Sequence, residues 1–136
     1  IAMMSYSNFG SSASPEARLV AEARKLVKER HPSLMVDGEM QANIAFNKEI
    51  LKENYPFSEL VDQDVNTLIF PNLSSANAGY KLLQAMDPDT EFIGPIQMGL
   101  NKPIHFTDFE SSVNDVVNIT AVAVIDAYVE KLKNSK

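Results

Sequence analysis

An α/β fold with a mostly parallel sheet and flanking helices is predicted by two features of this sequence. Short apolar segments alternate along the chain with segments of helical periodicity, and prolines, glycines and capping residues mark the boundaries between them. This alternation is typical of parallel sheets whose faces are covered by helices. Ligands of such sheets lie outside the carboxyl ends of the strands, so the loops after the predicted strands are the first candidates for a site.

The first strand and helix are predicted within residues 1–30. Residues 1–6 are apolar and run into the small polar residues 7–12, which is the pattern of a buried strand followed by a loop. Ser14 is placed to cap a helix that has Pro15 at its first position and continues to about Arg30. Because the chain opens within a strand-like run and without Met, we expect it to be part of a longer protein.

Two further strand and helix pairs follow. Residues 34–36 predict a short strand, and a helical stretch from about residue 39 to 54 is closed by Pro56. Residues 67–70 predict a third strand, and a helix is expected from Ser74 to about residue 86. The same period is therefore kept three times.

The last part of the chain predicts two more strands and a long helix. Residues 92–98 and 103–106 are strand-like, and Ser112 is placed to cap a helix that reaches about Lys133. Since that helix is apolar almost all round between residues 116 and 128, we expect it to be deeply buried.

Composition excludes several classes of function. The absence of cysteine rules out disulfide frameworks, cysteine-ligated zinc sites and thiol catalysis, and it fits the cytosol. A net charge of −6 without a basic stripe argues against nucleic acid as a partner. No apolar run is long enough to cross a membrane, and no export signal is present. We therefore expect a cytoplasmic protein that binds neither nucleic acid nor membrane.

Two loops carry the candidate ligand-binding residues. The loop after the first strand combines hydroxyl and amide side chains with a glycine, and such a loop can hold an anion such as phosphate, although a plain capping loop has the same composition. The loop after the third strand is similar and lies at the same predicted edge of the sheet. The candidates in the two loops are Ser7, Asn8, Gly10, Ser11, Asn72, Ser75 and Asn77.

The remaining chemically active residues have simpler explanations. Asp37 and Glu39 flank Gly38 and are interpreted as a turn and an N-terminal helix charge rather than as acid–base or metal-binding groups. His31 is expected on the surface at a helix end, and His105 has no second histidine or cysteine near it in the sequence. No metal site is predicted.

Six blocks of sequence, taken in order, resemble the motifs of phosphate acetyl/butyryl transferases. These blocks are 2–11 (AMMSYSNFGS), 36–41 (VDGEMQ), 68–73 (LIFPNL), 79–84 (GYKLLQ), 93–96 (IGPI) and 116–118 (VVN). The segment SNFGS in the first block and the segment SSV at 111–113 are most similar to the transferase-like domains of bacterial NADP-dependent malic enzymes.

The resemblance implies a two-lobed fold of the isocitrate-dehydrogenase-like (phosphotransacetylase) type, with coenzyme A and phosphate bound in the cleft between the lobes. Residues 1–95 would belong to the second lobe. Residues 96–136 would return to the first lobe with the buried C-terminal helix. The rest of the first lobe would lie outside this chain.

The resemblance also implies a catalytic pattern from which this chain departs. Family transferases carry a Ser-Arg pair and an aspartate six residues after the arginine, at the start of the last helix. Asp115 matches that aspartate, but Asp108 and Phe109 stand at the positions of the serine and the arginine. Asp115 also fits a capping box with Ser112, so no residue is assigned as catalytic. By the resemblance Asp115 is a further candidate for ligand binding.

By this resemblance the chain is expected to be a regulatory and oligomerisation domain that senses acetyl-CoA and lacks transferase activity. Its partners would be an acyl-CoA or acyl phosphate and further copies of itself in a homo-oligomer. NADP and a divalent metal would act in the malate-decarboxylating half of the parent enzyme. An active phosphate acyltransferase and a purely structural oligomerisation module are the two alternatives.

Overall fold

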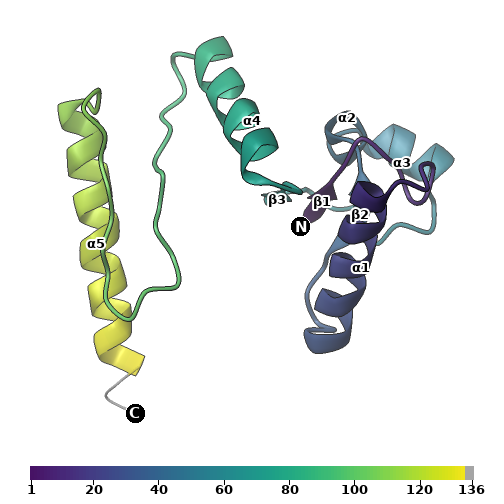
Figure 1. Cartoon of the computed structure of the whole chain (residues 1–136), viewed down its shortest axis with the longest axis horizontal. Helices are drawn as coiled ribbons and strands as arrows, with labels where there is room; N and C mark the ends of the chain where they lie inside the picture. The colour runs from purple at the N-terminus through teal and green to yellow at the C-terminus, as the bar shows by residue number, and fades with distance from the viewer. Residues whose placement is uncertain (134–136) are drawn as a thin grey trace. The chain divides into compact units, whose positions relative to one another are not determined.

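The computed structural model describes residues 1–133 and divides the chain into two compact units, Ile1–Leu83 and Gln84–Lys136 (Figure 1). This division falls twelve residues before the boundary of 95 that the family resemblance implies. The assignment of the two parts to two lobes stays a prediction.

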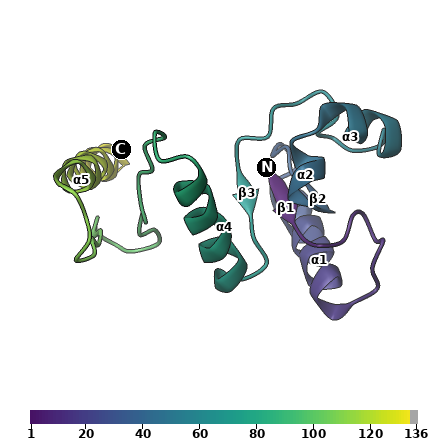
Figure 2. The ribbon, with the colours of Figure 1, turned by 90° about the horizontal axis from the view of Figure 1, so that it is seen from above.

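A three-stranded parallel sheet forms the centre of the first unit. β1 (Ala2–Met4) lies between β2 (Asp37–Met40) and β3 (Leu68–Ile69), and Ala2 is in register with the first residue of each neighbour (Figure 2). Parallel strands need crossover connections, and the helices between them supply these. The predicted α/β fold with a parallel sheet and flanking helices is confirmed.

The core lies on both faces of β1, because successive side chains of a strand point to opposite sides. On one face Ala2 and Met4 pack with buried residues that come after β1 along the chain. On the other face Met3 packs against α1 (Pro15–Arg30) and the residue before β2. The buried members of the two clusters are Ala2, Met4, Met40, Ile44, Ala45, Leu51 and Leu60, and Met3, Val20 and Val36.

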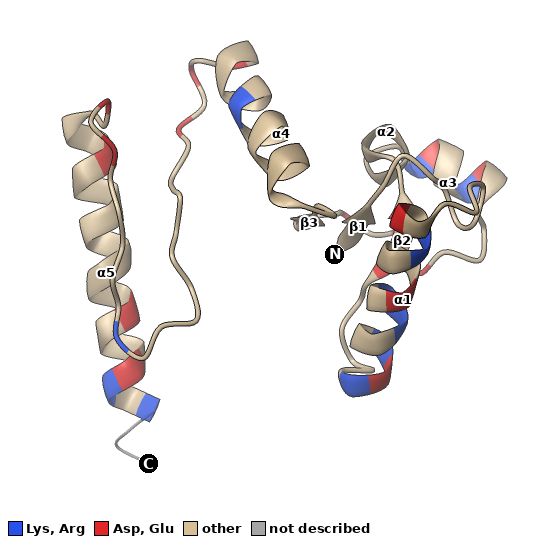
Figure 3. Cartoon of the chain, in the orientation of Figure 1, with Lys and Arg blue, Asp and Glu red and all other residues tan. Residues whose placement is uncertain are grey.

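Helix α1 begins where the sequence predicts. The Ser14 hydroxyl oxygen accepts a hydrogen bond from the N–H of Ala17 at 3.2 Å, and Pro15 occupies the first turn, where its missing N–H costs nothing. Ala17 and Val20 are buried, while charged residues cover the outer face (Figure 3). The predicted end at Arg30 is also confirmed.

The second predicted strand and helix are displaced. The strand is β2 rather than 34–36, and the helix expected from about residue 39 is replaced by the end of β2 and two short helices, α2 (Ala42–Ala45) and α3 (Lys48–Asn54). Gly38 has φ +131° and lies against Met3, where an added Cβ would be 2.6 Å from the carbonyl oxygen. Glycine therefore permits a strand at a position that looks like a turn in the sequence.

Helix α4 (Leu73–Met86) follows β3, and its position confirms the third predicted pair. In the second unit, α5 (Val113–Lys133) confirms the predicted last helix and its start after Ser112. Among residues 1–133, none of the helices combines the length and the apolar character that a membrane span requires.

Two predictions for the second unit are wrong for the described residues. Residues 92–98 and 103–106 form no strand, because a strand needs a hydrogen-bonded neighbour. The stretch at 103–106 runs along α5 instead (Figure 1). The expected deep burial of α5 is also absent, since Ile119 is its single buried residue. The chain before α5 contacts this helix through polar pairs such as Lys102 with Glu130 at 2.7 Å, and most apolar side chains of α5 are exposed.

Candidate functional site

The loop after β1 folds around a carboxylate that belongs to the protein itself. Glu39 is 2% exposed, and its Oε1 atom accepts hydrogen bonds from the Ser7 hydroxyl at 2.8 Å and from the Gly10 N–H at 2.6 Å. The carbonyl oxygen of Glu39 accepts a third bond, from the N–H of Phe9 at 2.8 Å. One residue of β2 therefore holds three residues of the loop, Ser7, Phe9 and Gly10.

The polar residues of this loop are also bonded to one another. The Ser7 hydroxyl lies 3.2 Å from that of Ser11 and accepts from the N–H of Ser12 at 3.0 Å. Ser11 in turn accepts from the N–H of Asn8 at 2.9 Å. The Asn8 side-chain oxygen accepts from the N–H of Gln41 at 2.8 Å, which links the loop to the end of β2.

The structure thus brings the first group of predicted ligand-binding residues together. Ser7 is buried, and its hydroxyl is occupied on both its donor and its acceptor side. Ligand binding by these residues stays a prediction, and the loop order needs no ligand to explain it.

The second predicted group forms the start of α4. The side-chain oxygen of Asn72 accepts from the N–H of Ser75 at 2.9 Å, and the Ser75 hydroxyl donates to the Asn72 carbonyl at 3.0 Å. Asn77 is exposed on the same helix. Because β1 and β3 are adjacent and parallel, both loops leave the same edge of the sheet. No charged residue lies between Asp64 and Lys81, so this side of the candidate site is neutral (Figure 3).

Asp37 is a structural residue whose importance the sequence interpretation missed. It is 1% exposed, and both of its carboxylate oxygens are used. Oδ1 accepts from the Arg24 guanidinium and from the Gly38 N–H, each at 2.9 Å. Oδ2 accepts from the Ser58 hydroxyl at 2.8 Å and from the Glu59 N–H at 3.0 Å. This carboxylate ties α1, β2 and the segment after α3 together, so the interpretation of Asp37 and Glu39 as a turn is wrong.

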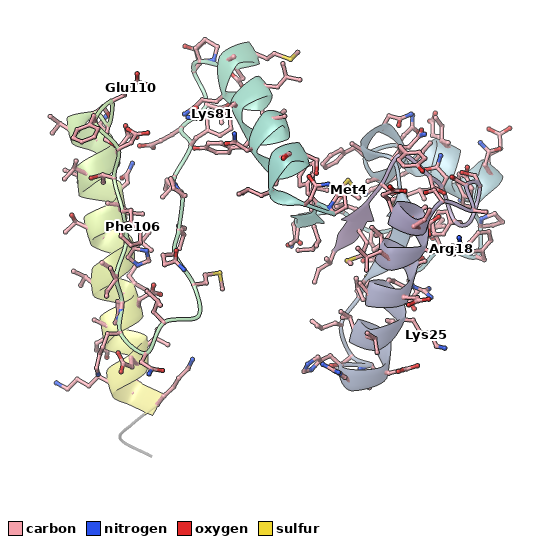
Figure 4. The ribbon with its side chains drawn as sticks, in the orientation of Figure 1. Met4, Arg18, Lys25, Lys81, Phe106 and Glu110 are labelled. Atoms are coloured by element: carbon pink, nitrogen blue, oxygen red, sulfur yellow. The ribbon has the colours of Figure 1, made fainter. Side chains whose placement is uncertain are left out.

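The residues at the two positions where the resemblance implies Ser and Arg, Asp108 and Phe109, form a tight turn before α5. Asp108 Oδ1 accepts from the N–H of Glu110 at 3.0 Å and from the Ser111 hydroxyl at 3.1 Å. Phe109 is fully exposed, and Glu110 projects from the same turn (Figure 4). Asp108 is therefore engaged in stabilising the turn.

Asp115 and Ser112 form the predicted capping box at the start of α5. The carboxylate of Asp115 accepts from the N–H and the hydroxyl of Ser112, both at 2.7 Å, and the Ser112 oxygen accepts from the Asp115 N–H at 3.1 Å. The bond from the Ser112 hydroxyl and the bond from its N–H lower the pKa of Asp115, because both stabilise the ionised form.

Replacing Ser112 with alanine is expected to raise the pKa of Asp115 toward its ordinary value, because the first of these two bonds is lost. Since the folded pKa of Asp115 is lowered, its contribution to stability is present above the unfolded pKa and is lost as the pH falls through the folded pKa. Carboxyl carbon chemical shifts, followed by NMR through an acid titration, measure the change. Ser111→Ala is the matched control, because that hydroxyl bonds Asp108; equal titrations of Asp115 in wild type and Ser112→Ala would contradict the assignment.

Within residues 1–133, no group of three or more metal-ligating side chains is present. His31 is exposed at the end of α1. The Nε2 atom of His105 lies 3.1 Å from a carboxylate oxygen of Asp126, so this ring makes an internal contact with α5.

Comparisons of the sequence and of the fold with known proteins agree on one family. The family model for phosphate acetyl/butaryl transferases covers residues 1–124. A phosphotransacetylase from Streptococcus pyogenes superimposes with a TM-score of 0.79 at 36% identity over 94% of this chain, and the EutD phosphotransacetylase from Staphylococcus aureus gives a TM-score of 0.78 at 30% identity. The chain belongs to the phosphate acetyl/butaryl transferase family.

The relatives fall into two groups. The NADP-dependent malic enzyme of Escherichia coli is 38% identical over 97% of this chain, and that of Haemophilus influenzae is 41% identical over 96%. The phosphate acetyltransferase of Bacillus subtilis is 37% identical over 93%. The chain spans 17% of the length of these malic enzymes and 39% of that transferase, and it corresponds to the C-terminal region of the malic enzymes.

Proposed function

We propose that this chain is the phosphotransacetylase-like domain of a cytoplasmic NADP-dependent malic enzyme, that it senses acetyl-CoA, and that it does not transfer acetyl groups. The observation that carries the proposal is the turn before α5. Asp108 and Phe109 stand there in place of the serine and arginine of the family pattern, while the family's aspartate is kept as Asp115.

Acetyl transfer between phosphate and a thiol needs a base for the thiol and a cation for the phosphate and the developing oxyanion. Arg30 is the last arginine of the chain. Between residues 103 and 125 the sequence has no Lys or Arg, and its acidic residues are Asp108, Glu110 and Asp115. Two of these carboxylates already hold a turn and a helix start. Such surroundings oppose a phosphate dianion rather than stabilise it.

Two other features support a regulatory domain rather than a purely structural module. The loop at residues 7–12 and the start of α4 are ordered and carry small polar side chains at one edge of the sheet. Helix α5 exposes apolar residues along its length, which is suited to contact with further protein in a homo-oligomer. NADP, the divalent metal and malate would bind in the part of the parent enzyme outside this chain.

Acetyl-CoA is expected to change malate decarboxylation by the parent enzyme through a coupling free energy of about 1–3 kcal/mol, or roughly 5- to 150-fold in apparent affinity, which is the usual size for linked sites. The measurement is the rate of NADPH formation against malate concentration, with and without saturating acetyl-CoA. Free coenzyme A and acetyl phosphate serve as the controls for the acyl and phosphate groups.

Two outcomes would contradict the proposal in different directions. Malate activity that is unchanged by every acyl-CoA and acyl phosphate at saturation would favour a structural oligomerisation module. Efficient formation of acetyl-CoA from acetyl phosphate would favour an active transferase.

A further inference from the structure

The loop after β1 shares features with anion-binding loops. Phe9 and Gly10 adopt left-handed conformations in succession, with φ of 48° and 87°. Backbone N–H groups in turns can line a concave site for an anion. The N–H of Gly10 points to the Glu39 carboxylate, whereas that of Phe9 donates to the Glu39 carbonyl oxygen. Small hydroxyl side chains at Ser7 and Ser11 add donors beside the Gly10 N–H.

Glu39 already occupies two of these donors. Its Oε1 atom accepts from the Gly10 N–H and from the Ser7 hydroxyl, so neither donor is open to an external phosphate while the carboxylate stays in place. Both Glu39 and Ser7 are almost fully buried, so the carboxylate enters the loop from the β2 side. The second acidic residue of β2 is different, because Asp37 turns to the Arg24 guanidinium.

We infer that Glu39 is a specificity-determining residue that fills the anion position of this loop from inside, so that the loop rejects phosphate and accepts only an uncharged part of a ligand. A phosphate of an acyl-CoA or an acyl phosphate would then have to bind elsewhere in the parent domain. The inference is independent of the proposed function, because it concerns inorganic phosphate and the loop alone.

Charge strengthens this exclusion beyond simple occupancy. Within residues 1–133, Glu39 forms no ion pair, and its bonds come from a neutral hydroxyl and a peptide N–H. A second anion about 5 Å from this carboxylate would be disfavoured on the order of 100-fold at the effective dielectric constant of a protein surface. Neutral amide or hydroxyl groups of a ligand meet no such penalty.

The test is a titration of the 136-residue chain with inorganic phosphate, followed by the NMR shift of the Gly10 amide. In the wild type, no saturable shift is expected. Glu39→Ala vacates the loop donors and removes the charge, so a saturable shift should appear at Gly10, with affinity on the order of 100-fold above any wild-type binding. Glu39→Gln keeps an acceptor in place, so the Gly10 site should stay closed.

Asp62→Asn is the control, since it removes one exposed negative charge from the same unit without vacating the loop donors, and it should leave the Gly10 amide unmoved by phosphate. Saturable phosphate binding at Gly10 of the wild type would overturn the inference, as would a folded Glu39→Ala variant that gains none. If Glu39→Ala does not fold, the test uses the wild type and Glu39→Gln. Saturable phosphate binding at Gly10 of either protein overturns the inference. A Gly10 amide that is protected from hydrogen exchange in both proteins, and that phosphate does not shift, supports the inference.

Discussion

Replacing Asp37 with alanine is expected to lower the free energy of unfolding of the Ile1–Leu83 unit by about 3 kcal/mol, the low end of the cost of removing one partner of a buried ion pair, because the Arg24 side chain is 36% exposed. The loss leaves the Arg24 guanidinium, the Ser58 hydroxyl and two backbone N–H groups without their acceptor. Unsatisfied buried donors add a desolvation cost to the lost attraction. The free energy of unfolding is measured by urea titration, with hydrogen exchange of the β1 and β2 amides as the probe of this unit.

Asp62→Ala provides the control, because Asp62 is an exposed acid in the segment that Asp37 anchors. Its removal should change the free energy of unfolding by no more than about 0.5 kcal/mol, as surface substitutions usually do. Similar losses in the two variants would show that the Asp37 network contributes little. Because whole domains are stable by roughly 5–15 kcal/mol, complete unfolding of the Asp37→Ala unit would agree with the expectation.

The same residue shows where prediction from sequence stops. α1 and α5 could be predicted because local caps mark their starts, with Ser14 before Pro15 and Ser112 paired with Asp115. β2 could not, because its acidic residues become favourable in a strand only when distant donors satisfy them. Arg24 and Ser58, which do so for Asp37, lie 13 and 21 residues away. Local pattern contains no sign of such partners.

The second unit shows the converse limit. Residues 92–106 have the apolar pattern of strands, and α5 has the composition of a buried helix. The apolar pattern of a segment indicates that it is suited to a strand or to burial. A strand forms only beside a second strand, and a helix is buried only where another apolar surface packs against it. Among the described residues, the partners of α5 are polar contacts such as Asn118 with Glu91 at 2.5 Å.

The sequence predicts which residues lie in the two loops, but not which hydrogen bonds these residues form. The small polar residues after β1 and β3 do gather in ordered loops, as strand ends in parallel sheets require. No local pattern indicates that Glu39 occupies the first loop, because this acceptor lies 29 positions along the chain from Gly10. The departure at Asp108 and Phe109 from the pattern that the resemblance implies stays a prediction from the sequence, and the following experiment tests it.

Restoring the family pattern in the parent enzyme, by Asp108→Ser, Phe109→Arg and Glu110→Gly together, is expected to raise acetyl transfer from acetyl phosphate to coenzyme A by roughly 100- to 1,000-fold. One preorganised electrostatic stabiliser is typically worth about 2.7–4 kcal/mol in the transition state, and a guanidinium binds phosphate through two charge-assisted bonds. The same change removes two carboxylates from the turn before α5. Formation of acetyl-CoA, measured at saturating substrates, gives the rate.

The matched control carries Gln instead of Arg at position 109 with the other two changes kept, so that the removal of negative charge is separated from the gain of the cation. If the guanidinium is what the turn lacks, the Gln control should gain far less than the Arg variant. Serine at 108 can still accept from the N–H of Glu110's replacement, so the turn should survive in both variants. Efficient acetyl transfer by the unmodified enzyme would contradict the proposal directly, because it would mean that the family's chemistry proceeds with Phe109 in place of the arginine.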